Sequence, residues 1–559
     1  MKRNYWHRAL SRPLTRRQVL GRVVKAGIGL TGFSLLGCAA APAATPTPTK
    51  PGATPVAPQA TATPVRPITG GILKVAQPAT SHTDPARSTG GTNAWQLENI
   101  CNGLLTLDKT GKPAPELAES WEIPDPTTIV LKLRKGVKFH DGVDFNAQVI
   151  KFNYDRILDP ATQSPRLPNM KNIIKSYDVV DDYTFKMTLL RPSAGIFESV
   201  LTSGTGGMPG QMMSPEAVKK YDNDLRAGKG VGTGPFQMVD WVQDSQTTAK
   251  KFPGYWEKGF PYLDEIQWRV IPDPTVTFTM IKTGEVHFAA EIAPKDVPLA
   301  KADPNLVPII DMSVGLVGPL MNQKEPPFNK TALRQALVYA IEREPINKAV
   351  YMGLFPVANG FFPPTHWAYD ATLKGYPYDP AKAKEKLKEG GAPEGFEFIA
   401  QPASAWPEHV QYAEAMKEML AKVGIKMQIQ VAERAKVLDD YRKGSVPMWV
   451  THLSGSPEPH RLVDNWFYSK SGYGLSNRDP EDPLTKQVDA LIEKGDSVYN
   501  IEDRRAIYSQ LQKLIFDNAY GMIVLFHRPL TQLQRKEVQG YEPFVEQYVT
   551  RFKRVWLQK

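Results

Sequence analysis

The sequence predicts an α/β protein of two or three lobes, and three observations support this. Removing the first 66 of 559 residues leaves 493, whereas a single hydrophobic core stops growing near about 300 residues. Helix-spaced and alternating apolar patterns follow one another along this part, which is typical of α/β lobes with mostly covered sheets. Residues 228–235 read GKGVGTGP. Such a segment suits a flexible crossing between lobes, because glycine tolerates backbone angles that other residues avoid.

In the first half of the folded part, apolar spacing separates strands from helices. Alternating apolar residues predict strands at 72–75, 128–134, 183–189 and 266–270. Helical spacing predicts helices over 94–105, 146–158 and 273–284. Asn146 is suited to cap the second of these helices, and Asp273-Pro274 is typical of a helix start. Gly284 is expected to end the third helix.

The second half repeats units of a helix followed by a strand. Helical spacing predicts helices over 331–350, 380–390, 410–423 and 507–515. Pro345 is expected to bend or end the first of these, because proline lacks the amide proton of the helix ladder. Strands are predicted at 425–431, by alternation, and at 522–526, by a continuous apolar run. No repeat of 20–50 residues is evident, so a solenoid is not expected.

The N-terminal segment has the features of an export signal. Basic residues precede an apolar run at 26–36, which is too short to span a bilayer comfortably. The run ends at Leu35-Leu36-Gly37-Cys38. With Arg16-Arg17 before it, this segment resembles a twin-arginine lipoprotein leader, in which Cys38 becomes the first residue and carries lipid. Two alternatives stay open: loss of Cys38 with residues 1–38, and general secretory export.

Residues 39–66 are predicted to be a disordered tether, because Ala, Pro and Thr supply 22 of these 28 positions. The chain has 68 basic and 58 acidic residues, and residues 1–64 contain nine of the basic ones and no acidic one. The remainder therefore carries 59 minus 58, or +1. This balance gives no reason to expect nucleic-acid binding. Cys101 is the other cysteine, expected as a small buried apolar residue.

Several stretches resemble the extracellular solute-binding proteins of peptide and nickel ABC importers, family 5. They are residues 115–155 (with LRKGVKFHDG), 232–256 (GTGPFQMVDW…GYW) and 322–370 (with PPFNKTALRQALVYAIEREPI). The resemblance implies a type II periplasmic-binding-protein-like fold with a ligand cleft between two α/β lobes. It places lobe I at 67–104, 231–311 and 529–559, an inserted subdomain at 105–230, and lobe II at 312–528. It also implies ABC permease partners, no cofactor and a monomer. The leader adds the expectation that the protein is exported and anchored by lipid to the outer face of the cytoplasmic membrane.

Binding clefts combine aromatic walls with a few polar groups. The candidates for such a cleft are Trp406, His409, His452 and Ser456, with Trp449 and Trp241 behind them. Each also has a plainer interpretation, as a core residue or a solvated helix end. In peptide-binding members of the resembled family, an acidic residue in a W-x-A-D-Y type segment holds the peptide's amino group. Here Ser456 or Gly455 falls at that position, and Glu458 or Asp464 is an alternative acid.

The resemblance predicts a receptor that captures a small solute, oligopeptide-like or else an oligosaccharide or metal chelate. His452 and His460 lack a third ligand at workable spacing, so no metal site is expected. The competing class is a secreted lipoprotein hydrolase. The sequence contains no G-x-S-x-G, H-E-x-x-H or Cys-x-x-Cys pattern, so nothing in it favours hydrolysis.

Overall fold

The computed structural model describes residues 66–559 except 79–82, 89–93, 205–207, 227, 472–476 and 547. The part from Arg66 to Lys559 forms one compact unit. The predicted signal at 1–38, its Cys38 and almost all of the predicted tether at 39–66 lie outside the described residues. Among the described helices, none combines the length and apolar character that a membrane span requires.

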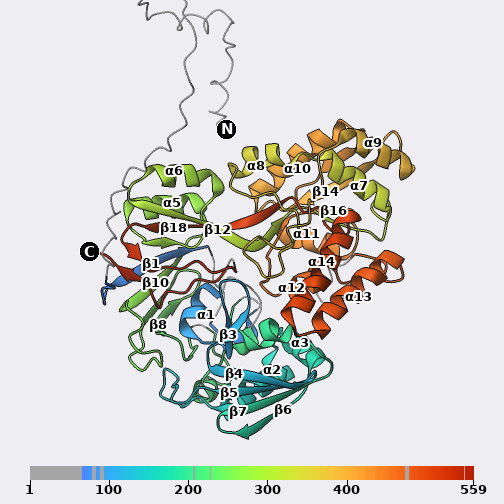
Figure 1. Cartoon of the computed structure of the whole chain (residues 1–559). Helices are drawn as coiled ribbons and strands as arrows, with labels where there is room; N and C mark the ends of the chain where they lie inside the picture. The colour runs from blue at the N-terminus through green and yellow to red at the C-terminus, as the bar shows by residue number, and fades with distance from the viewer. Residues whose placement is uncertain are drawn as a thin grey trace, which may run out of the picture. The chain divides into compact units, whose positions relative to one another are not determined.

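The largest sheet among the described residues has eight strands in the order β17-β12-β18-β11-β1-β10-β9-β8 (Figure 1). Its strands are β1 Ile72–Gln77, β8 Phe236–Val242, β9 Gln246–Lys251, β10 Glu265–Val270, β11 Phe288–Ala289, β12 Leu306–Val317, β17 His452–Leu453 and β18 Phe526–Arg535. The central strand β1 pairs in parallel with β10 and β11, whereas β12 and β18 pair antiparallel over most of their length. Helices accompany this sheet: α1 Ala94–Ile100, α4 Pro215–Lys220, α5 Pro274–Thr283 and α6 Val297–Ala302.

A second, four-stranded sheet in the described chain has the order β13-β16-β14-β15. Its strands are β13 Leu320–Met321, β14 Glu397–Pro402, β15 Lys426–Ile429 and β16 Met448–Val450. The helices of this part are α7 Thr331–Ala340, α8 Arg343–Tyr351, α9 Pro380–Glu389, α10 Pro407–Ala421, α11 Arg434–Arg442, α12 Pro459–Phe467, α13 Pro483–Ser497 and α14 Ile501–Asp517. Together they form the right-hand part of the body in Figure 1.

A third sheet, β4-β5-β7-β6, is wholly antiparallel and lies at the bottom of Figure 1 under two helices. Its elements are β4 Ala118–Asp125, β5 Thr128–Leu133, β6 Ile174–Asp181, β7 Thr184–Leu189, α2 Ala147–Leu158 and α3 Leu167–Ile173. Two small ribbons complete the described strands: β2 Leu105–Leu107 with β3 Pro113–Pro115, and β19 Val538–Gln539 with β20 Trp556–Leu557.

The chain passes between the first two sheets where strands of one continue into the other. β12 ends at Val317 and β13 begins at Leu320, while β16 ends at Val450 and β17 begins at His452. The amide of Leu525 donates to Val317 O (2.9 Å), just before β18. Three neighbouring segments therefore connect the two parts, which is an arrangement compatible with hinge motion.

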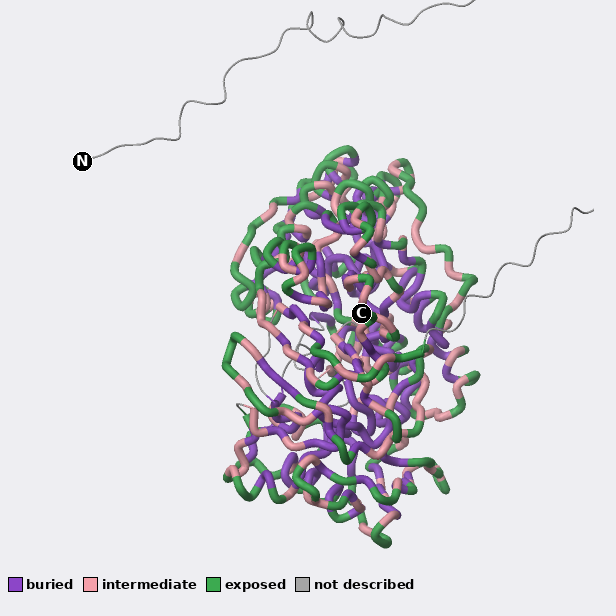
Figure 2. Tube along the Cα trace, turned by 90° about the vertical axis from the view of Figure 1, so that its left-hand side faces the viewer, coloured by how far each residue is buried: buried purple, intermediate pink, exposed green. Residues whose placement is uncertain are grey.

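Separate hydrophobic cores belong to these parts. One core packs α2 and the third sheet, with Ile129, Tyr154 and Phe185 fully buried. Another packs β1, β10 and α1, and two more lie around the second sheet and under α12–α14. Figure 2 shows buried residues concentrated in the interior of the described chain and exposed residues along its outer turns. The lobe boundaries at 104, 230, 311 and 528 stay a prediction.

Most of the predicted elements are confirmed. Asn146 caps α2 by accepting from the amides of Gln148 and Val149. α7 ends at Ala340 and α8 begins at Arg343, so a break of two residues confirms the predicted interruption near Pro345. Gly284 ends α5 in the left-handed conformation that favours glycine (φ +86°).

Two predicted ranges were wrong. The helix expected over 94–105 ends at Ile100, because the chain then turns to other partners: Gly103 bridges Gln211, and Leu105 begins β2. The strand expected at 522–526 begins only at Phe526. Met522 forms an isolated bridge with Leu320, since this segment crosses between sheets instead of running along one.

The glycine-rich segment packs closely against neighbouring backbone. A Cβ atom added at Gly232 would lie 2.3 Å from Ile100 O, and one at Gly234 would lie 2.5 Å from the carbonyl carbon of Ile100. A Cβ at Gly230 would meet Thr83 O at 2.6 Å. These glycines are thus required for close approach to the end of α1 and to the loop after β1, a role that differs from the flexible crossing expected.

Candidate functional site

A cavity of about 240 Å³ lies between elements of the first sheet and elements that follow the second. One wall comes from the end of β1, the loop before α5, the segment after β11 and strand β18. The other wall comes from the end of α8, the start of α10 and His452. His452 is on β17, at the edge of the first sheet, whereas α8 and α10 share a hydrophobic core with the second sheet. A solute held in the cavity would therefore contact both parts.

Three predicted site residues meet at this cavity: Trp406, His409 and His452. The Trp406 ring lies with its centroid 5.3 Å from the centroid of each imidazole. Nε2 of His409 lies 2.8 Å from Nδ1 of His452, so one imidazole donates a hydrogen bond to the other. Pro407 begins α10 directly after Trp406, which places Trp406 and His409 on neighbouring turns at the cavity wall.

Both imidazoles of this pair are neutral at physiological pH. Burial, with a further contribution from Arg528, lowers the pKa of His409 to about 3. Burial and nearby cations, Arg528 first among them, lower the pKa of His452 well below its usual value. A neutral imidazole offers one donor and one acceptor. The pair therefore presents a polar but uncharged surface to a solute.

The cavity also contains an ion pair that the sequence analysis missed. Nη2 of Arg528 on β18 donates to Oε1 of Glu291 at 2.6 Å, and the Arg528 side chain is 11% exposed. Nη1 of Arg528 is buried and has no hydrogen-bond partner among the described residues. Burial lowers the pKa of Arg528, but Glu291, Tyr548 and Glu408 outweigh burial and hold it above its usual value. The guanidinium is thus charged. Nη1 makes no hydrogen bond within the described residues, although the Tyr548 hydroxyl lies near enough to contribute to the raised pKa.

Glu408 adds a second carboxylate on the opposite wall. It lies in the first turn of α10 and forms no ion pair among the described residues. Burial raises the pKa of Glu408, and Glu291 adds to the increase while Arg528 opposes it. Its position between Trp406 and His409 was a usable sequence signal. Arg528 was equally detectable, as a lone charge within the apolar strand pattern Leu525-Phe526-His527-Arg528-Pro529-Leu530.

Three other predicted residues lie outside the lining of this cavity. Trp449 is buried on β16, with its ring centroid 5.7 Å from that of Tyr441. Ser456 is buried and its hydroxyl accepts from the Glu458 amide (3.1 Å). Trp241 lies on the edge strand β8, beside Gly228. Their roles in ligand binding stay predictions.

The alternative acids also have other surroundings. Both carboxylate oxygens of Glu458 accept from Arg504, and the two side chains are each 6% exposed. Asp464 lies on α12 and does not line the cavity, and burial raises its pKa. Neither side chain is therefore placed to contact a solute in the cavity.

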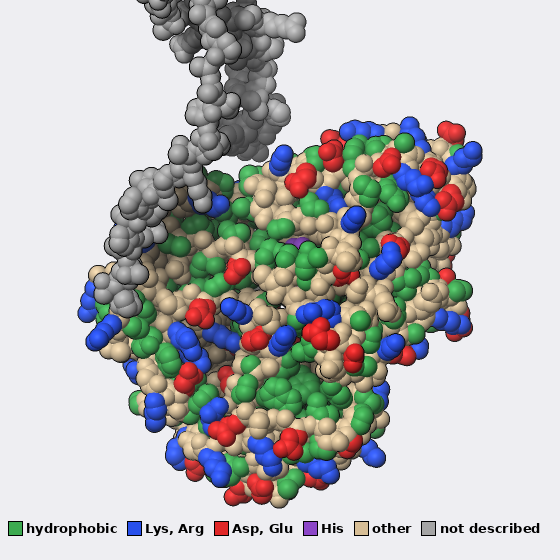
Figure 3. Space-filling model, viewed as in Figure 1, with side chains coloured by type: hydrophobic (Ala, Val, Ile, Leu, Met, Phe, Trp, Pro, Cys, Tyr) green, Lys and Arg blue, Asp and Glu red, His purple; other side chains and the backbone are tan. Residues whose placement is uncertain are grey.

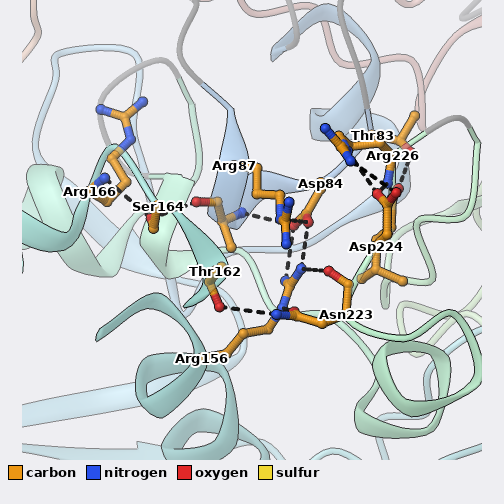
Figure 4. Close-up of polar contacts among 12 residues, drawn as sticks. Thr83, Asp84, Arg87, Arg156, Thr162, Ser164, Arg166, Asn223, Asp224 and Arg226 are labelled. Carbon is orange, nitrogen blue, oxygen red and sulfur yellow. Dashed lines mark hydrogen bonds and ion pairs between the residues drawn. The ribbon is translucent and has the colours of Figure 1, made fainter. Parts of the chain in front are cut away.

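Asp84, in the loop after β1, is held by a different network (Figure 4). Its carboxylate accepts from Nη1 of Arg156 at 3.0 Å and pairs with Nη2 at 2.5 Å, and both side chains are almost fully buried. Asp84 also caps the short turn that begins at Pro85. This ion pair connects the loop after β1 to α2, so Asp84 acts as a structural residue.

The described residues contain no group of three or more His, Cys, Asp or Glu side chains that could hold a metal ion. His452 pairs with His409, whereas His460 lies 3.6 Å from Asp496. Figure 3 shows acidic and basic side chains interspersed over the visible face, without a large area of one charge. Proteins that bind nucleic acid carry a basic patch on one face, and the visible face of this protein has no such patch.

A family description matches residues 112–474: bacterial extracellular solute-binding proteins, family 5 middle. This range is more than half of the chain. The chain belongs to this family. The prediction of a family 5 extracellular solute-binding protein is therefore confirmed.

Among curated relatives, the glutathione-binding protein GsiB of Salmonella choleraesuis (strain SC-B67) is 32% identical over 470 residues. The alignment covers 82% of this chain and 89% of GsiB. GsiB of Escherichia coli O157:H7 is equally similar, at 32% over 470 residues.

Solved structures confirm the type II periplasmic-binding-protein-like fold. The periplasmic binding protein DppA of Helicobacter pylori, in complex with peptide STSA, aligns with a TM-score of 0.73 and 28% identity. That alignment covers 88% of this chain and 99% of DppA. AgaA from A.tumefacien R10, in complex with agropinic acid, aligns with a TM-score of 0.73, 25% identity and the same coverage. This chain is thus an extracellular solute-binding protein by family and by fold.

Proposed function

We propose that this protein is the substrate-binding component of an ABC importer and captures a peptide-like solute in the cavity between its two main parts. The observation that carries the proposal is the composition of that cavity. It combines aromatic side chains and a neutral histidine pair with one acid that has no ion partner, and an arginine nitrogen that has no hydrogen-bond partner, in the part of the chain that the structure describes. Clefts of this composition bind and orient small polar solutes.

The proposed solute is short. A volume of about 240 Å³ lies near the lower end of small-molecule sites. Nη1 of Arg528 is suited to donate to a carbonyl or carboxylate oxygen, which peptides and glutathione both provide. Relatives that bind glutathione and a peptide support this class of solute. An agropinic-acid-binding neighbour supports a non-peptide solute as the second candidate.

Capture is proposed to proceed by closure of lobe II, at 312–528, on lobe I, at 67–104, 231–311 and 529–559. The inserted subdomain is proposed at 105–230. Closure requires contacts that the open form lacks, and a solute touching both walls provides them. We further propose export, anchoring of the protein through lipid on Cys38 outside the cell, and delivery of the solute to membrane permease subunits by a monomer.

Thermal unfolding with a ligand panel tests the proposal. A solute at 100 times its dissociation constant should add about 2.7 kcal/mol to the free energy of unfolding. The panel contains di- to pentapeptides, glutathione, agropinic acid, a nickel–histidine chelate and oligosaccharides. We expect stabilisation by short peptides or glutathione. Stabilisation by oligosaccharides or the chelate alone would reject the peptide class, and turnover of any compound would favour the hydrolase alternative.

A matched variant localises the binding. Trp406→Ala removes an aromatic wall of the cavity and should weaken binding of the stabilising ligand. Trp241→Ala, on the edge strand away from the cavity lining, is the control and should leave affinity unchanged if the cavity is the site. The opposite pattern would place the ligand elsewhere.

A further inference from the structure

The positive and negative charges of the described side chains that line the cavity do not cancel. Glu291 and Arg528 form an ion pair, so their charges offset each other. Glu408 remains, and it has no ion partner among the described residues. The two histidines at the cavity are neutral. The described lining therefore carries one excess negative charge when Glu408 is ionised.

Solvent can only partly compensate this charge. Glu408 lies in a part of α10 that is half-buried against the cavity. Burial of a carboxylate disfavours its charged form, and the raised pKa of Glu408 reflects this. Arg528, the cation facing Glu408 across the cavity, is already engaged by Glu291. A cation that enters the cavity would restore the balance.

We propose that the captured solute carries an ammonium group and that Glu408 is the specificity-determining residue that binds it. This inference rests on the proposed function and deepens it by naming a required group of the solute. The aromatic rings of Tyr351 and Phe355 line the same cavity, and aromatic faces attract cations. The Trp406 ring also lines it but already carries the Arg434 guanidinium, 5.2 Å from the ring centroid. Nη1 of Arg528 then donates to an oxygen of the same solute.

Other acids of the chain fit this role less well. The resemblance places an acid near Ser456, but a serine stands there and lies away from the cavity lining. Glu458 is engaged by the buried Arg504. Glu291 lines the cavity but is paired with Arg528. Among the charged residues of the described lining, Glu408 alone has a carboxylate without a cation partner.

The test compares two probes on the purified full chain: an equimolar pool of dipeptides with free amino termini, and the same pool N-acetylated. Binding is measured by calorimetry and by tryptophan fluorescence. Wild type should bind the free-amine pool at least roughly 30-fold more tightly, as expected for removal of one partner of a desolvated charge pair. Glu408→Gln should lose that preference, and Glu408→Asp should keep part of it.

Glu414→Gln is the matched control. Glu414 lies on the same helix, its side chain is 54% exposed, and it does not line the cavity. The Glu414→Gln variant should bind both dipeptide pools with the affinities of wild type. Unfolding of Glu408→Gln without ligand should equal that of wild type, which separates a binding effect from misfolding.

Each outcome decides between the two proposals. Equal binding of both pools by wild type would overturn the ammonium inference and leave the peptide-binding function in place. Binding of neither pool would reject the proposed function. If Glu408→Gln still preferred the free-amine pool, another residue would bind the amino group.

Discussion

Replacement of Glu458 by glutamine should destabilise the protein without weakening solute binding. Glu458 precedes α12, accepts from the amide of His460 at 3.0 Å, and engages both terminal nitrogens of Arg504 on α14. Each of the two side chains is 6% exposed. Glutamine preserves the shape but leaves the Arg504 guanidinium buried without its counter-ion.

The size of the effect follows from this burial. Removing one partner of a buried ion pair costs about 3–5 kcal/mol, because the remaining charge is uncompensated. Arg504 keeps hydrogen bonds to Gly495 O (3.1 Å) and to the Tyr508 hydroxyl (3.2 Å), so the lower end of this range is expected. For a cooperative unit the size of the predicted lobe II, at 312–528, each kcal/mol corresponds to roughly 2–4 °C in Tm. The expected decrease in Tm is therefore about 10 °C.

Urea unfolding and calorimetry measure the decrease, and Glu481→Gln is the control. Glu481 pairs with Lys486 at 2.8 Å, but the two side chains are 80% and 58% exposed. A surface pair of this kind contributes about 0–1 kcal/mol. An equally small loss in Glu458→Gln would refute the idea that burial makes the Arg504 pair important. Weaker solute binding by folded Glu458→Gln would refute its assignment as a structural residue.

Three further predictions concern other groups. Asp84→Asn should lower the free energy of unfolding by about 3 kcal/mol, because it leaves Arg156 buried without its partner; urea unfolding measures this, and a neutral result would contradict it. Burial and Glu98 raise the pKa of Glu116 from 4.5 to about 7, so the stability from its protonated form should be lost as pH rises through 7. Glu116→Gln should lack this loss in unfolding between pH 5 and 8, and identical pH profiles would exclude it. Cys38→Ala should release the protein from membranes in fractionation, and retention of the variant would argue against a lipid anchor.

Several local features could be read from the sequence because they depend on neighbouring residues. The cap at Asn146 and the helix start at Asp273-Pro274 are set by side chains within one turn of the amides they bind. Trp406 and His409 were candidate cleft residues because binding clefts combine aromatic walls with a few polar groups, and both line the cavity. The wrong helix end at 94–105 arose where Gly103 pairs with a segment far along the chain.

Partners of buried charges could not be read in this way. Glu458 was an alternative acid for the site in the sequence, and only the fold brings Arg504 to it. Arg156 likewise meets Asp84 only in the folded chain. Arg528 and Glu408 come from β18 and α10, which are distant in sequence but face each other across the cavity.

By itself, the sequence determined most of the succession of helices and strands, the family, and the near-zero net charge of the folded part. Apolar periodicity and helix capping depend on residues a few positions apart, so they can be recognised in the sequence. The tertiary structure alone decided which charges are neutralised inside the protein and which remain for a solute, because electrostatic pairing depends on distances between segments that meet only when the chain folds.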